Sequence, residues 1–130
     1  MKLLDTTFLV DYYRGKRSVE YYLESSENED LITSTINLKE ILVGVELLDG
    51  SPEETIQDFG WLQIVNYSLD HAREAAKIES ELRKDDVHQN KINTLMGDIL
   101  IAGAAQNMDA EVVTRNVEDF ELLGLETVTY

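Results

Sequence analysis

Two of the acidic side chains that could do chemistry come just after apolar segments expected to be strands. Asp5 comes directly after Lys2–Leu4. Asp119 comes shortly after Glu111–Thr114, and Asn116 lies between that segment and Asp119. In open α/β sheets ligands bind outside the carboxyl ends of the strands, so both acids are expected at that edge. The alternatives are that Asp5 only caps the following helix and that Asp119 is an ordinary turn acid.

Glu40 lies on an apolar face of a helix predicted to start at Ser34 or Thr35 and to end at Leu48. The residues at helical spacing on this face are Ile36, Glu40, Val43, Gly44 and Leu47. A glutamate in apolar surroundings lowers stability unless it is paired, protonated or bound to a cation. A buried salt bridge is the alternative, but the chain has only 11 Lys and Arg residues to supply a partner.

Asp98 opens a predicted helix, Ile99–Gln106, that is apolar on nearly every side and is therefore expected at the centre of the fold. Alone, Asp98 is explained as a first-turn acid stabilised by the helix dipole. Together with Asp5, Glu40 and Asp119 it predicts several carboxylates in one cleft, which would repel one another without a counter-charge. Hard oxygen ligands suit Mg²⁺ or Mn²⁺, and the absence of cysteine excludes thiolate chemistry.

The overall charge limits the choice of partners. The formal charge of −15 opposes loose binding to nucleic acid at low salt. Either the protein has no polyanionic partner, or it works in a high-salt cytoplasm where the repulsion is screened. The basic residues nearest to the acidic motifs are candidate phosphate contacts, with a solvated surface role as the alternative: Arg14, Lys16, Arg17, Lys39 and Arg115.

The alternation of strand and helix patterns predicts how these residues are positioned. Strands are expected at 2–4, 31–33, 62–65, 111–114 and 127–129, with helices between them and a polar loop at 85–93. This pattern predicts an α/β fold with a mainly parallel sheet of four to five strands, flanked by helices on both faces. We expect a single domain over residues 1–130. No apolar run approaches the ~20 residues that span a bilayer, so a cytoplasmic protein without a membrane partner is expected.

Four motifs, in order along the chain, resemble those of PIN-domain ribonucleases. They are L-L-D-T-T-F-L-V-D, I-N-L-K-E-I-L-V-G-V, G-D-I-L-I-A and V-V-T-R-N-V-E-D-F. Their order and spacing are most similar to the VapC-like toxins of type II toxin–antitoxin pairs. The resemblance implies a PIN-like fold, a Mg²⁺- or Mn²⁺-dependent endoribonuclease that hydrolyses RNA phosphodiester bonds, a homodimer, and a small cognate antitoxin as partner.

The resemblance also assigns residues. Asp5, Glu40 and Asp98 match the three principal acids, with Asp5 and Asp98 as metal ligands. Either Asn116 or Asp119 completes the site, and Thr114 belongs to the same segment. Thr7 departs from the family's usual Asn or Ser, but its hydroxyl can still hydrogen-bond a carboxylate.

Two other functions remain open from the residues alone. One is a phosphatase with Asp5 as covalent nucleophile. Such an enzyme would need a second Asp at the position of Thr7. The other is a catalytically silent, receiver-like module whose acids only hold an ion. Cleavage of RNA that requires Mn²⁺ separates the ribonuclease from the silent module, and a trapped phospho-aspartate identifies the phosphatase.

Overall fold

The computed structural model describes residues 1–130 and contains one parallel sheet. Its five strands have the order β3-β2-β1-β4-β5, and every neighbouring pair is parallel. The strands are β1 (Lys2–Leu4), β2 (Leu31–Ser34), β3 (Gln63–Val65), β4 (Glu111–Val113) and β5 (Thr127–Val128). All strands therefore end at the same edge of the sheet. The predicted α/β class and parallel sheet are confirmed.

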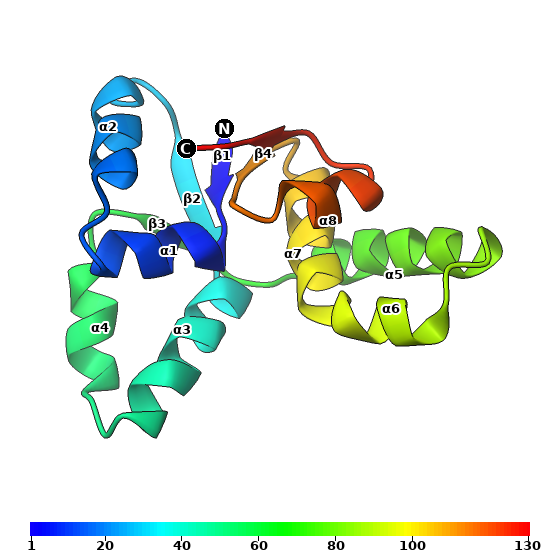
Figure 1. The fold of residues 1–130 in the computed structure, drawn as a ribbon, viewed down its shortest axis with the longest axis horizontal. Coiled ribbons are helices and arrows are strands. Elements are labelled where there is room, and N and C mark those ends of the chain that lie inside the picture. The colour runs from blue at the N-terminus through cyan, green and yellow to red at the C-terminus, as the bar shows by residue number, and fades with distance from the viewer.

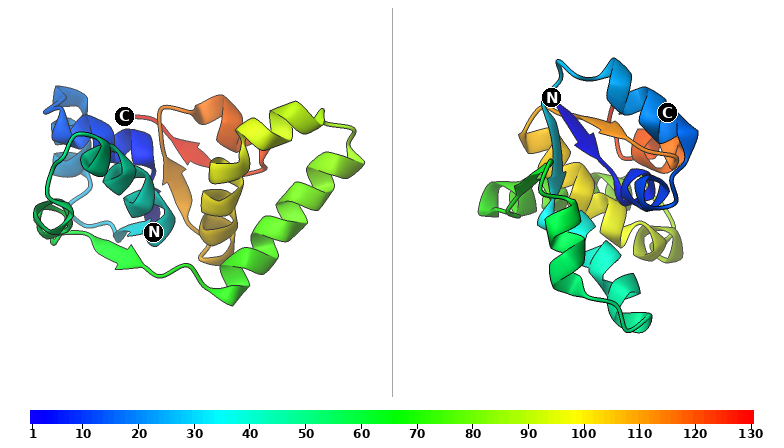
Figure 2. Two further views of the ribbon diagram at one scale, coloured as in Figure 1. Left: turned by 90° about the horizontal axis from the view of Figure 1, so that it is seen from below. Right: turned by 90° about the vertical axis from the view of Figure 1, so that its left-hand side faces the viewer.

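Eight helices cover the two faces of the sheet (Figures 1 and 2). They are α1 (Thr6–Tyr13), α2 (Arg17–Ser25), α3 (Thr35–Leu47), α4 (Pro52–Asp58), α5 (Leu69–Lys84), α6 (Gln89–Thr94), α7 (Met96–Asn107) and α8 (Val117–Leu122). Side chains of α1 to α3, together with Phe59 directly after α4, form one apolar cluster against the sheet, and side chains of α5 to α8 form another. The prediction of helices on both faces is confirmed.

Serine residues begin three of the helices. Ser34 and Ser68 form capping boxes at the starts of α3 and α5, and Ser51 caps α4 in front of Pro52. Each of these side chains accepts a hydrogen bond from a backbone N–H that the helix itself cannot satisfy. The starts of α3 and α5 therefore agree with the sequence pattern.

The predicted loop at 85–93 is wrong, because α6 begins within it. Ile92 is fully buried in the core and holds this polar helix against α5 and α7. This helix has six residues and one buried apolar side chain, so it is too short to show a repeating apolar pattern in the sequence. None of the eight helices is both long and apolar enough to cross a bilayer.

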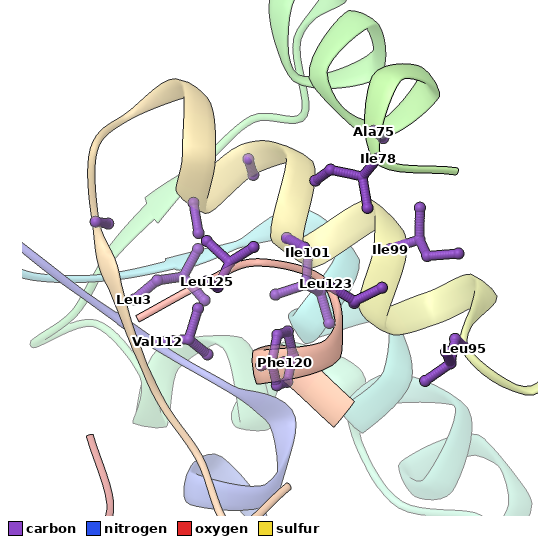
Figure 3. Close-up of a cluster of buried hydrophobic side chains, with 14 of the residues drawn as sticks. Leu3, Ala75, Ile78, Leu95, Ile99, Ile101, Val112, Phe120, Leu123 and Leu125 are labelled. Carbon is purple, nitrogen blue, oxygen red and sulfur yellow. The ribbon is translucent and has the colours of Figure 1, made fainter. Parts of the chain in front are cut away.

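The central helix α7 packs directly on α5 at Gly103. A Cβ atom at this position would lie 2.6 Å from the carbonyl oxygen of His71 and 2.7 Å from the Cβ of Ala75. Figure 3 shows Ile78 of α5 beside Ile99 of α7, with Phe120 and Leu123 on the side of α7 that faces the sheet. This close contact fixes α7, and with it Asp98 in its first turn, relative to the rest of the core.

Two glycine substitutions test this contact. Gly103→Ala should lower the free energy of unfolding by about 1–3 kcal/mol, because the added methyl group meets backbone atoms of α5. Gly44→Ala, in α3, has no atom within 4 Å of the new Cβ and should raise stability by up to about 1 kcal/mol. Urea unfolding of both variants measures the difference, and equal effects would contradict the close packing at Gly103.

Candidate active site

Asp5 is a buried carboxylate at the carboxyl end of β1. It is 2% exposed, and its Oδ2 accepts hydrogen bonds from the hydroxyls of Thr114 at 2.8 Å and Thr7 at 3.1 Å. Although Asp5 occupies the position before α1, its side chain makes no capping hydrogen bond to that helix. Burial raises the pKa of Asp5, and the hydrogen bonds from Thr114 and Thr7 partly offset this rise.

Asn37 is a member of the site that the sequence reasoning missed. It is fully buried, and its Oδ1 accepts hydrogen bonds from the backbone N–H and the hydroxyl of Ser34, at 3.2 and 2.7 Å. Its Nδ2 donates to Thr6 Oγ1 at 3.1 Å and to Asp5 Oδ1 at 3.4 Å. The capping box that starts α3 therefore also orients an amide towards Asp5. The signal in the sequence was an Asn three residues after a strand-ending Ser.

Glu40 lies one turn further along α3 and reaches the start of α7. Its Oε1 would be 3.1 Å from a Cβ atom at Gly97, so a glycine there lets the two helices approach closely. Burial raises the pKa of Glu40. A hydrogen bond with Thr6 lowers it, and the charge of Asp5 raises it again.

The apolar stripe predicted around Glu40 is only partly buried, which corrects the sequence interpretation. Val43 is 46% exposed and Leu47 is 79% exposed, whereas Ile41 on another face of α3 is buried. The reason is that the second half of α3 extends beyond the sheet, where only α4 packs on it (Figure 1). Glu40 stands at the boundary between the core and this exposed apolar surface.

Asp98 lies in the first turn of α7, and Leu95 rather than Asp98 is the residue before the helix. Burial raises the pKa of Asp98 to about 7, with further contributions from the charges of Asp5, Asp119 and Glu40. The charge of Lys91 lowers this pKa, by less than the acids raise it. Asp98 therefore interacts electrostatically with the three other acids, and the four carboxylates lie in one region at the end of the sheet.

Asp119 and Asn116 differ in how they approach this region. Asp119 is in the first turn of α8, and its Oδ1 lies 3.3 Å from Lys91 Nζ at the outer side of the acidic group. Asn116 is exposed and its side chain does not cap α8, but its backbone N–H donates to Thr114 Oγ1 at 2.9 Å. Asp119 thus contributes charge, while Asn116 supports Thr114 through the backbone.

The donor set fits a small divalent cation that keeps part of its water shell. The four acids offer only oxygen atoms. Besides burial, the charge of Asp5 raises the pKa of Glu40, and the charges of Asp5, Asp119 and Glu40 raise the pKa of Asp98. The structure holds no group of three or more acidic or histidine side chains spaced to enclose an ion. Mg²⁺ is usually bound by one or two carboxylates and several waters, so a pair of these acids is sufficient.

The five candidate phosphate contacts fall into two groups. Arg14, Arg17 and Lys39 are exposed and form no salt bridge. Lys16 and Arg115 both contact Asp11, a buried acid of α1 that the sequence reasoning did not single out.

The raised pKa of Asp98, caused by burial and by the neighbouring charges, gives a test by pH. The folded metal-free protein keeps the Asp98 proton up to about pH 7, whereas the unfolded chain loses it near the ordinary value of 3.8. The cost of ionising Asp98 should therefore lower the free energy of unfolding as pH rises between these values. Asp98→Asn avoids this cost. In chelator, the melting temperature of the variant should therefore be higher than that of the parent at about pH 8 and equal to it at about pH 4.

Asp70 provides the control for this test. It is also a first-turn acid, but it lies exposed at the start of α5. Asp70→Asn should therefore give no gain at either pH, because it removes only a favourable interaction with the helix dipole. Equal behaviour of the two variants in thermal melts would show that Asp98 is not under repulsion from its neighbours.

Comparison with known proteins places this site in a family. The model of the PIN domain matches residues 2–124. VapBC2 from Rickettsia felis, solved bound to a DNA fragment from its promoter, is 22% identical with a TM-score of 0.81, covering 99% of this chain and 98% of that one. A toxin–antitoxin complex from Klebsiella pneumoniae is 26% identical with a TM-score of 0.72, covering 92% and 90%. FitAcB from Neisseria gonorrhoeae is 23% identical with a TM-score of 0.79, covering 98% and 96%.

The sequence has no significant match among curated proteins. The family match nevertheless extends over nearly the whole chain and includes all four acids of the cluster. This chain belongs to the PIN domain family.

Proposed function

We propose that this protein is a Mg²⁺- or Mn²⁺-dependent endoribonuclease and the toxin of a type II toxin–antitoxin pair. The observation that carries the proposal is the group of four carboxylates at the carboxyl edge of the sheet, where burial and then the charges of Asp5, Asp119 and Glu40 raise the pKa of Asp98. Such a group is electrostatically unfavourable alone and becomes favourable around a divalent cation. Membership of the PIN domain family supports a nuclease.

Each acid has a proposed role in this reaction. Asp5 and Asp98 hold the metal ion, Glu40 binds it directly or through water, and Asp119 orients the attacking water or a second ion. A bound divalent cation supplies a Lewis acid for the phosphate and a water of lowered pKa. Thr7 and Thr114 fix the Asp5 carboxylate by donating to its Oδ2, and Asn37 holds its other oxygen.

The phosphatase alternative has less support. Thr7 stands where a second Asp would be needed as the acid for the leaving group, and its hydroxyl donates to Asp5 instead.

An antitoxin partner is supported by the three similar solved structures and by the surface of this protein. The exposed apolar side chains of α3 line an open groove of about 400 Å³ together with Lys39 and Glu46. Exposed apolar surface of this kind marks a site of protein interaction. We assign it to the antitoxin, because the similar Klebsiella pneumoniae structure is a toxin–antitoxin complex. The homodimer and the cytoplasmic location are proposed from the family resemblance alone.

Glu40→Gln tests the enzymatic proposal. The variant should keep the fold, because glutamine has the same shape, and it should cleave RNA about a hundredfold more slowly because the metal site loses a charge. Mn²⁺ should raise the melting temperature of the parent more than that of the variant.

The matched control is Glu46→Gln, on the exposed part of the same helix, which should cleave and respond to Mn²⁺ like the parent. The measurement is cleavage of a mixture of cellular RNAs with Mn²⁺ and with chelator. Undiminished cleavage by Glu40→Gln would reduce Glu40 to a structural residue, and cleavage that survives chelator would rule out the metal.

The toxin proposal predicts that a small antitoxin binds tightly and suppresses cleavage. An arginine of the antitoxin can form a bidentate pair with a carboxylate at the place of the metal ion. Co-expression with the neighbouring small reading frame, followed by pull-down, should recover a complex that does not cleave RNA. Recovery of this protein alone, together with normal growth of cells that express it alone, would contradict the assignment.

A further inference from the structure

Asp11 is a fully buried carboxylate that the proposed metal site does not use. It is 0% exposed, and its Oδ2 lies 2.7 Å from Arg115 Nε and accepts a hydrogen bond of 2.6 Å from the Tyr130 hydroxyl. Its Oδ1 has no hydrogen-bond partner and lies 3.4 Å from Lys16 Nζ. A buried charge is strongly destabilising unless it is paired, so these partners are needed to keep Asp11 ionised.

The local backbone explains why Lys16 reaches Asp11. Gly15 adopts a left-handed conformation, with φ of 68°, after the end of α1. This turn brings the chain back, so that the backbone N–H of Lys16 donates to the carbonyl of Asp11 at 3.1 Å. The lysine side chain is thereby placed beside the carboxylate of the same helix end.

The partners of Asp11 keep it charged. Burial alone raises its pKa, but the hydrogen bond from Tyr130 and the charges of Arg115 and Lys16 outweigh burial and lower the pKa below its ordinary value. The group therefore carries two positive charges and one negative charge, a net charge of +1.

The negative charge of this group is hidden and the positive charges are accessible. The Asp11 side chain is 0% exposed, whereas the side chains of Arg115 and Lys16 are 44% and 47% exposed. Solvent therefore meets two cations whose counter-ion lies beneath them. Most of this protein is expected to repel a polyanion, because its net charge is −15. These two exposed cations instead form a local surface that attracts one.

Arg115 connects this pair of cations to the acidic cluster. Arg115 directly follows Thr114, and its backbone N–H donates to Thr7 Oγ1 at 3.1 Å. Thr114 and Thr7 are the two residues whose hydroxyls donate to Asp5. Arg115 and Asp119 also line the same surface hollow of about 360 Å³. A nucleic acid strand bound at the acidic cluster would therefore pass beside Arg115, and Lys16 is linked to Arg115 through the shared Asp11 carboxylate.

We propose that Asp11 is a positioning residue that holds Arg115 and Lys16 as a two-cation clamp for an RNA backbone phosphate beside the acidic site. Arg115 contacts Asp11 through Nε, and its guanidinium can present further donors to phosphate oxygens. The clamp attracts the backbone without reading its sequence. This inference rests on the proposed ribonuclease function, because it assigns the substrate that the cations contact.

The sign of the effect of Asp11→Asn separates the clamp from two simpler roles. If Asp11 were only a nearby negative charge, its removal would make the surface more positive and RNA would bind more tightly. If Asp11 were only structural, the melting temperature would fall while RNA affinity stayed the same. The clamp predicts weaker binding, because Arg115 and Lys16 repel each other and separate once their shared counter-ion is gone.

The experiment measures the affinity for a short, fluorescein-labelled single-stranded RNA of mixed sequence at several salt concentrations. All proteins carry Asp98→Asn and are kept in chelator, so that the RNA is not cleaved. Each lost phosphate contact should reduce the slope of log affinity against log salt by about 0.7. We expect Asp11→Asn to bind several-fold more weakly, with a slope reduced by about 0.7 to 1.4 for one or two contacts.

Two control variants make the test specific. Asp58→Asn changes the net charge by the same amount at an exposed acid of α4, which accepts a hydrogen bond from Tyr13 of α1. It should bind RNA at least as well as the reference protein. Lys16→Gln should reduce the slope by about 0.7, whereas Lys84→Gln, at the end of α5 on the far side of the molecule, should leave it nearly unchanged (Figure 1).

The outcomes decide between the proposals. Unchanged or tighter binding by Asp11→Asn overturns the clamp, as does a reference protein that does not bind the RNA at all. If Asp11→Asn does not fold, Lys16→Gln decides, and an effect no larger than that of Lys84→Gln overturns the clamp. Failure of the ribonuclease proposal is seen separately, as a parent protein that gains no stability from Mn²⁺ and cleaves no RNA.

Discussion

Mutual repulsion among four carboxylates is the constraint around which the rest of this structure is organised. The four acids come from separate segments: Asp5, Glu40, Asp98 and Asp119. The fold holds them together although, in addition to burial, the charges of the other three raise the pKa of Asp98. The scaffold must therefore be rigid enough to keep like charges close. The parallel sheet provides this, because β1 and β4 are neighbours and both end at the same edge.

Small residues and hydroxyl groups make this arrangement possible. Gly103 lets α7 lie against α5, and Gly97 leaves space for Glu40 at the start of α7. Thr7 and Thr114 donate hydrogen bonds to Oδ2 of the buried Asp5. These contacts are local consequences of the sequence, but their common effect is to place acids where a cation would be stabilising.

No cation forms a salt bridge with Asp5, Glu40 or Asp98. Lys91 pairs with Asp119 at the outer side, and Arg115 pairs with Asp11 rather than with Asp5. If a lysine or arginine occupied the cluster itself, no metal ion would be needed there. The same separation leaves positive charge beside the cluster, where it can attract a phosphate without displacing the metal.

The sequence predicted the features that depend on local patterns. The strands, the long helices and the parallel sheet follow from periodicity and from the serine caps at Ser34 and Ser68. The helix α6 was missed because a single buried Ile92 gives no periodic signal. Asp11 was missed because it resembles an ordinary helix-surface acid, and its burial depends on Tyr130, 119 positions away along the chain. The exposure of Val43 and Leu47 depends on how far α3 extends beyond the sheet, which the sequence pattern does not reveal.

The most direct test of a cation held by this cluster is the number of protons released when Mn²⁺ binds. Because Asp98 has a pKa of about 7 in the folded protein, it carries about half a proton at pH 7, and a metal ligand must lose it. Calorimetric titration of Mn²⁺ in buffers of different ionisation enthalpy should therefore show release of about half a proton at pH 7 and almost none at about pH 9. Absence of Mn²⁺ binding, or a proton release that is the same in Asp98→Asn, would contradict the account.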